Sequence, residues 1–274
     1  MSSLQLLINS PFDLIMVPFQ SMSPLWALSF FSLLASLLML LTFRYTSDQQ
    51  RIRETKNAIK ARLLELWIFR DDVRITLSAQ GKLLLLNGRY LKLAMKPMMV
   101  MIVPLALIVI LLEGWFGYRP LRPGEAVIVS MQVSDGVLGL LENASLYAGN
   151  GVKVETPPLR ISMAKEVDWR IRADAPGTHK VTLDLSGNHL EKQVVVLEGL
   201  VRVSPSRFAS TFWQTLLYPG EPPIPKEFGI ERIDISYPTR FIKIFRWEIH
   251  WLVVFFALSI VFAFAFKRIF RVEM

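Results

Sequence analysis

The sequence predicts an α-helical membrane protein, with three transmembrane helices and a cytoplasmic helical hairpin, that also carries an all-β sandwich domain. Three long apolar runs, a basic segment between the first two and a series of short alternating stretches indicate this architecture. The composition agrees, because 52% of the 274 residues are hydrophobic and only 20% are charged. A chain with so much apolar surface to bury is not expected to be disordered.

The first predicted transmembrane helix covers residues 25–43, a run without a charged residue. At 1.5 Å per residue it is about 28 Å long, close to the thickness of the hydrocarbon core. No Lys or Arg precedes Arg44, and the run is too long for the apolar region of a signal peptide, so we interpret it as a retained anchor. The preceding residues 1–24 are apolar but interrupted by proline, which favours a segment at the outer membrane interface, helical over 4–8 and 12–17.

Residues 44–97 are predicted to form a basic helical hairpin in the cytoplasm. The first arm begins after Ser47 or Asp48, either of which can cap it, and the turn is expected between Asp71 and Gly81. An apolar stripe recurs every seven residues and serves either packing within the hairpin or a partner: Ile52, Ile59, Leu66 and Val73. The basic face is expected to meet solvent or lipid headgroups, with a ribosome or RNA contact as the alternative: Arg51, Arg53, Lys56, Lys60 and Arg62.

The second and third predicted spans are residues 98–116 and 248–266. The second span begins directly after Pro97 and contains Pro104, and these prolines would kink or shorten its helix. Basic residues set the orientation, because cytoplasmic loops are enriched in Lys and Arg. Segment 44–96 has twelve Lys and Arg against five Asp and Glu, whereas no basic residue precedes the first span. We therefore expect an inner-membrane protein with its amino terminus outside and the tail, residues 267–274, in the cytoplasm.

Residues 117–203 change to a period of two, with β-branched stretches separated by turn signals such as Gly149-Asn150-Gly151. This pattern predicts an antiparallel β-sandwich on the outer side. Within it, Val167 to Leu197, with Trp169 in one strand and Pro176-Gly177 before the next, resembles the immunoglobulin-like domains of bacterial envelope proteins. A proline-rich linker, residues 204–247, follows and could contain a last strand at 230–235.

The sequence contains no recognisable catalytic motif and few residues suited to catalysis or metal binding. The chain has no cysteine and three histidines, which excludes thiolate chemistry and leaves no set of metal ligands at suitable spacing. No nucleotide-binding or hydrolase motif is present. We therefore predict no enzyme activity, no catalytic residue and no cofactor.

Polar and flexible side chains inside the predicted spans are the stronger candidates for functional residues. Ser29, Ser32 and Ser36 fall on one face of the first span, where small residues favour close helix packing or a hydrophilic groove for a polar segment of a substrate. Met98, Met99 and Met101 lie at the cytoplasmic end of the second span. Methionine adapts to varied apolar surfaces, so these residues are either core filler or a slide for substrate helices.

The stretch from Phe43 to Ile110 contains TSDQQRIRETKNAIKARLLEL and YLKLAMKPMMVMIVPLALI. With an outward amino terminus, a basic hairpin between two spans and a third span, it resembles the YidC/Oxa/Alb superfamily of membrane insertases. The likeness is greatest to its three-span branch, which includes archaeal YidC-like proteins and the core insertase subunit of the endoplasmic-reticulum membrane complex. The resemblance implies an insertase that uses a polar groove without nucleotide hydrolysis.

Under that resemblance the serines line the groove, the methionines guide substrate helices, and the basic residues of the hairpin meet a nascent chain, the ribosome or lipid headgroups. The implied partners are the lipid bilayer and nascent membrane proteins. The alternative is a structural or scaffold subunit of a cell-envelope or transport complex, which docks its partners through the sandwich. Nucleic acid is not expected as a partner, because the basic residues lie beside the ends of the spans and lack an array of aromatic side chains for base stacking.

Overall fold

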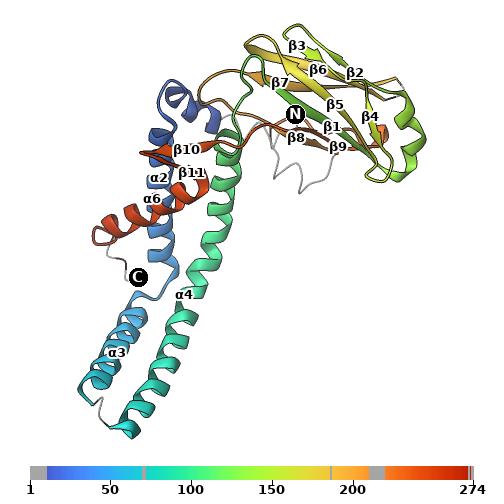
Figure 1. The fold of residues 1–274 in the computed structure, drawn as a ribbon. Helices are drawn as coiled ribbons and strands as arrows, with labels where there is room; N and C mark the ends of the chain where they lie inside the picture. Colours follow the sequence, from blue (N-terminus) through green and yellow to red (C-terminus); the bar gives the residue numbers. More distant parts are fainter. Residues whose placement is uncertain (1–10, 70–71, 186, 210–219, 271, 273–274) are drawn as a thin grey trace. The chain divides into compact units, whose positions relative to one another are not determined.

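The fold of the chain is given by a computed structural model, which describes residues 11–69, 72–185, 187–209, 220–270 and 272 (Figure 1). The chain divides into two compact units. Residues 28–108 and 252–274 form one, here named the helical unit, and residues 1–27 and 109–251 form the other, named the β unit. The predicted mixture of apolar helices and antiparallel β-sheets is confirmed.

Four helices contribute to the helical unit: α2 (Pro24–Thr46), α3 (Gln49–Ile68), α4 (Val73–Phe116) and α6 (Trp251–Phe266). Helix α2 starts at Pro24, whose fixed φ suits the first position of a helix. Asp48 caps α3, because its side chain accepts a hydrogen bond of 3.0 Å from the backbone N–H of Arg51. The predicted cap is thus confirmed as Asp48.

The turn between α3 and α4 lies earlier than predicted. Phe69 follows the last residue of α3, and α4 begins at Val73, so that Gly81 is inside a helix instead of in the turn. The Asp72 side chain accepts a hydrogen bond of 2.9 Å from the N–H of Arg74, which satisfies a free amide of the first turn. An isolated glycine costs a helix only about 1 kcal/mol, which the rest of a 44-residue helix outweighs.

Helix α4 continues through both prolines. Pro97 and Pro104 are inside it, so the second apolar run is not shortened and joins the second arm of the hairpin without a break. Within the described residues, α2 and the Thr76–Phe116 part of α4 are long and apolar enough to cross a membrane. The third apolar run is shorter, because α6 has 16 residues and starts three residues later than the predicted span.

The β unit contains eleven strands within the described part of the chain (Figure 1). Their bounds are β1 (Ala126–Val133), β2 (Ala144–Ala148), β3 (Val152–Val154), β4 (Leu159–Ile161), β5 (Glu166–Ala173), β6 (Gly177–Leu185), β7 (Asn188–Val196), β8 (Ser206–Phe208), β9 (Ile230–Ile235), β10 (Phe241–Ile244) and β11 (Trp247–His250). Short 3₁₀ helices are η1 (Val17–Phe19), η2 (Asp135–Asn143) and η3 (Lys226–Phe228). The larger sheet has the order β3-β5-β1-β9-β8, with β4 also on β5, and the smaller has the order β2-β6-β7.

The two sheets share one hydrophobic core, to which β1, β5, β6, β7 and β9 contribute alternate residues. Trp169 on β5 is 2% exposed and is the largest side chain of this core, as the sequence predicts. The linker contains more structure than expected. Besides β9 at the predicted position, it contributes β8 and most of a separate two-stranded hairpin of β10 and β11.

The amino-terminal segment is held by the β unit. Residues 11–16 are helical, whereas the predicted helix over 4–8 lies outside the described residues. The Asp13 carboxylate accepts hydrogen bonds of 2.9 and 3.1 Å from Arg202 and one of 3.3 Å from the Trp115 indole. Charge-assisted bonds of this kind are stronger than neutral ones, so they fix the segment against the end of α4.

Candidate functional site

The predicted serine face lies inside the helical unit. Ser32 and Ser36 are both fully buried, and Ser29 is half-buried. The Ser32 hydroxyl donates to the carbonyl oxygen of Phe255 on α6 at 3.1 Å, and the Ser36 hydroxyl donates to that of Leu33 at 2.8 Å. Small side chains therefore bring α2 and α6 together, which is the packing alternative considered for this face.

Helices α2 and α6 run in the same direction. Ser32 contacts Phe255 near their beginnings, and Leu40 and Phe43 share an apolar cluster with Phe266 near their ends. One turn beyond Phe255, the hydroxyl of Ser259 is buried and has no hydrogen-bond partner in the part of the chain that the structure describes. A row of buried hydroxyl groups thus follows this helix pair, and such groups are costly in a hydrocarbon environment.

The three predicted methionines lie on different faces of α4. Met98 and Met99 are more than half exposed, whereas Met101 is half-buried and packs on the cluster around Leu40. A cavity of about 10 Å³ beside Met101 is lined by α2 and α4. This volume is about the minimum for one water molecule, so the space between the two helices at that level holds little more than one water molecule.

The basic face of the hairpin is largely accessible. Arg51, Arg53 and Lys60 are exposed, and Lys56 and Arg62 are half-buried. A shallow pocket of about 180 Å³ is lined by the side chains of both hairpin helices: Lys56, Ile59, Lys60, Asn87 and Tyr90. Two ammonium groups beside amide and phenol groups favour an anionic group in this pocket, such as a lipid phosphate or a carboxylate.

The apolar stripe of the hairpin turns largely inward. Ile52 is buried with Leu40 and Phe43, and Ile59 and Leu66 are half-buried. The side chain of Val73 lies outside what the structure describes. The observed burial supports packing within the protein for the part of the stripe nearest α2.

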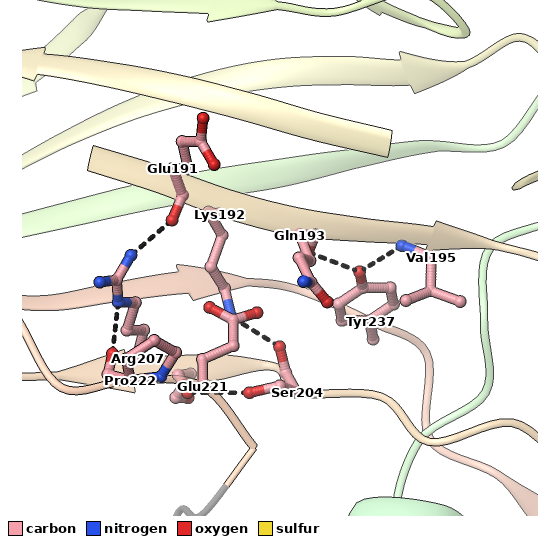
Figure 2. Close-up of polar contacts among 10 residues, drawn as sticks. Glu191, Lys192, Gln193, Val195, Ser204, Arg207, Glu221, Pro222 and Tyr237 are labelled. Carbon is pink, nitrogen blue, oxygen red and sulfur yellow. Dashed lines mark hydrogen bonds and ion pairs between the residues drawn. The ribbon is translucent and has the colours of Figure 1, made fainter. Parts of the chain in front are cut away.

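The β unit contains a buried ion pair that the sequence analysis missed (Figure 2). Lys192 on β7 is 0% exposed, and its ammonium group lies 3.0 Å from a carboxylate oxygen of Glu221. It also donates to the carbonyl oxygen of Ser204 at 2.7 Å. Burial lowers the pKa of Lys192, against the opposing effect of Glu221.

Two further side chains tie the sheets together near this pair (Figure 2). Arg207 on β8 donates to the carbonyl oxygens of Pro222, at 2.7 Å, and Glu191, at 2.5 Å. The Tyr237 hydroxyl accepts from the N–H of Val195 at 3.0 Å, and burial raises its pKa. The bond from Arg207 to Glu191 joins β8 of the larger sheet to β7 of the smaller sheet, and Lys192 joins β7 to the segments on either side of β8. These bonds are together named the polar latch.

A pocket of about 290 Å³ adjoins the latch at Ser204 and Gly220. Its remaining walls come from the last turns of α4 and the segment after β7: Val109, Ile110, Glu113, Gly114, Tyr118, Arg202, Val203 and Pro205. Gly220 is required for space, because an added Cβ would lie 2.6 Å from the Ser204 hydroxyl. Lys192 itself does not line the pocket, so the latch is structural in this arrangement.

The sequence did contain a signal for Lys192. In the stretch from Asn188 to Val196, inward positions alternate, and Lys192 falls between Leu190 and Val194 on the inward face. A lysine on the inward face predicts a buried carboxylate partner, but the pattern does not identify which carboxylate this is.

Among the described residues, no three His, Asp or Glu side chains lie close enough to share a metal ion. No protein family, curated protein or solved structure matches this chain.

Proposed function

We propose that this chain is a membrane-protein insertase or chaperone of the cell inner membrane, which helps other membrane proteins to insert or assemble without hydrolysing nucleotide. In this proposal α2, the second half of α4 and α6 are three transmembrane helices. The amino terminus and an immunoglobulin-like sandwich face outward, and the α3–α4 hairpin and the carboxyl terminus face the cytoplasm. The basic residues of the hairpin supply the positive charge that favours the cytoplasmic side.

The observation that carries the proposal is the combination, within the helical unit, of buried hydroxyl groups with exposed methionines. Ser32, Ser36 and Ser259 place three buried hydroxyl groups inside the helical unit, and the Ser259 hydroxyl has no hydrogen-bond partner among the described residues. Met98 and Met99 present flexible apolar side chains at the surface. A surface of this kind suits varied hydrophobic helices, because methionine repacks around different partners.

Site-specific photo-crosslinking during synthesis tests the proposal. A photoreactive residue at Met99 is expected to capture the nascent chains of several different membrane proteins. The matched control is Met163, which is equally flexible and 99% exposed but lies on the β unit, where few nascent chains are expected to be captured. Absence of nascent-chain adducts at Met99, with the protein folded and in the membrane, would contradict the insertase proposal.

The second candidate is a scaffold subunit of an envelope complex, and one observation favours it. The surface of the β unit has an open groove of about 640 Å³ along β1 and β5, with apolar walls that include Ile128, Pro157 and Leu159. A groove of this size fits a segment of a partner protein. In the same crosslinking experiment, a single stable partner captured from Leu159, with no nascent chains at Met99, would favour the scaffold.

A further inference from the structure

One face of the β10–β11 hairpin is apolar along its whole length. Cross-strand pairs place Ile242 opposite Ile249 and Ile244 opposite Trp247, all on one face. Exposure on this face rises toward the tip, from Ile242, which is 3% exposed, to Trp247, which is 75% exposed. The base of the hairpin is thus packed against the protein, whereas its apolar face continues outward without cover among the described residues.

The tip of the hairpin presents a second large aromatic side chain. Phe245 is fully exposed and has a φ of +54°, which bulky residues rarely adopt. Backbone in this region is strained for a non-glycine residue, and such strained positions cluster at functional sites. A glycine or asparagine would form the same two-residue turn more easily. An aromatic residue here exposes apolar area at the expense of turn stability.

Basic side chains surround these aromatic residues. Arg246 is the second residue of the turn and is exposed, and Lys243 is the exposed residue two positions before the tip. Glu248, opposite Lys243, lies 3.1 Å from its ammonium group, so the acidic charge next to the tip is compensated. The tip therefore combines two exposed aromatic rings with net positive charge.

We propose that the tip of the β10–β11 hairpin inserts into the headgroup region of an anionic phospholipid bilayer. Phe245 and Trp247 reach the boundary between headgroups and acyl chains, where aromatic rings are favoured, and Arg246 and Lys243 contact lipid phosphates. The position of the hairpin in the chain supports insertion into a bilayer. Strand β11 ends at His250, and α6, a proposed transmembrane helix, begins at the next residue, Trp251. The inference rests on the proposed membrane location but not on insertase activity.

The chain has no cysteine, so single cysteines can carry an environment-sensitive fluorophore. Phe245→Cys tests the tip, Met163→Cys is an exposed control on the β unit, and Val103→Cys, 73% exposed on α4, reports the membrane span. Each labelled full-length protein is reconstituted into vesicles of phosphatidylcholine and phosphatidylglycerol. Emission is then measured with brominated lipids and, separately, with iodide in the aqueous phase.

The proposal predicts that the probe at 245 shifts to shorter wavelength, is quenched by brominated lipid and is protected from iodide, whereas the probe at 163 is quenched by iodide alone. Iodide quenching at 245 with lipid quenching at 103 would overturn this inference and leave the membrane span intact. Protection at 245 from both quenchers would indicate a protein partner and would also overturn it. Iodide quenching at both 245 and 103 would overturn the membrane location itself.

Discussion

Replacing Lys192 with methionine is expected to destabilise the β unit by about 3–5 kcal/mol, because Glu221 would remain buried without its cation. The carbonyl oxygen of Ser204 would lose its donor as well. The double variant Lys192→Met/Glu221→Leu removes both charges and is expected to be less destabilised than Lys192→Met alone. The measurement is thermal unfolding of the full-length protein, followed by near-ultraviolet circular dichroism.

Lys180→Met is the matched control on the neighbouring strand β6. Lys180 lies 2.6 Å from Glu191, but both side chains are about 60% exposed. Solvent screens such a pair, so its loss is expected to cost less than about 1 kcal/mol. Equal effects of Lys192→Met and Lys180→Met, or a double variant at least as destabilised as Lys192→Met alone, would contradict the role given to the latch.

Trp169→Ala is expected to cost about 3–5 kcal/mol of the stability of the β unit, because the ring fills the core that both sheets share. The lost packing would affect both sheets, so a single cooperative transition at a lower temperature is expected. Trp67→Ala serves as the control, since Trp67 is 74% exposed on α3. Calorimetry of the two variants measures the difference, and an unchanged transition for Trp169→Ala would be incompatible with one shared core.

The polarity and periodicity of the sequence predict the elements of this fold well where one physical effect dominates. The run over 25–43 has no charged residue and becomes α2, and the alternation around Trp169 becomes β5 with the ring inward. The turn predicted between Asp71 and Gly81 is shorter in the structure, because α4 already begins at Val73. The capping bond to the N–H of Arg74 starts the helix earlier, and one glycine is too weak a signal to stop it.

Other features depend on contacts between distant residues. The partner of Lys192 is 29 positions away, and no local pattern identifies Glu221 among the acidic residues of the linker. The β10–β11 hairpin was also missed, because its turn contains Phe245 and Arg246 in place of the usual turn residues. For the serine face, periodicity places Ser32 and Ser36 together, but only the position of Phe255 shows what they contact.

We propose that α2 and α4 cross a membrane and separate a cytoplasmic hairpin from an external β unit. Single cysteines at Asn57, exposed on α3, and Met163, exposed on the β unit, test this topology with a membrane-impermeant maleimide on spheroplasts. The expected result is labelling of position 163 in intact spheroplasts and of position 57 only after permeabilisation. Labelling of position 57, but not 163, in intact spheroplasts would contradict it.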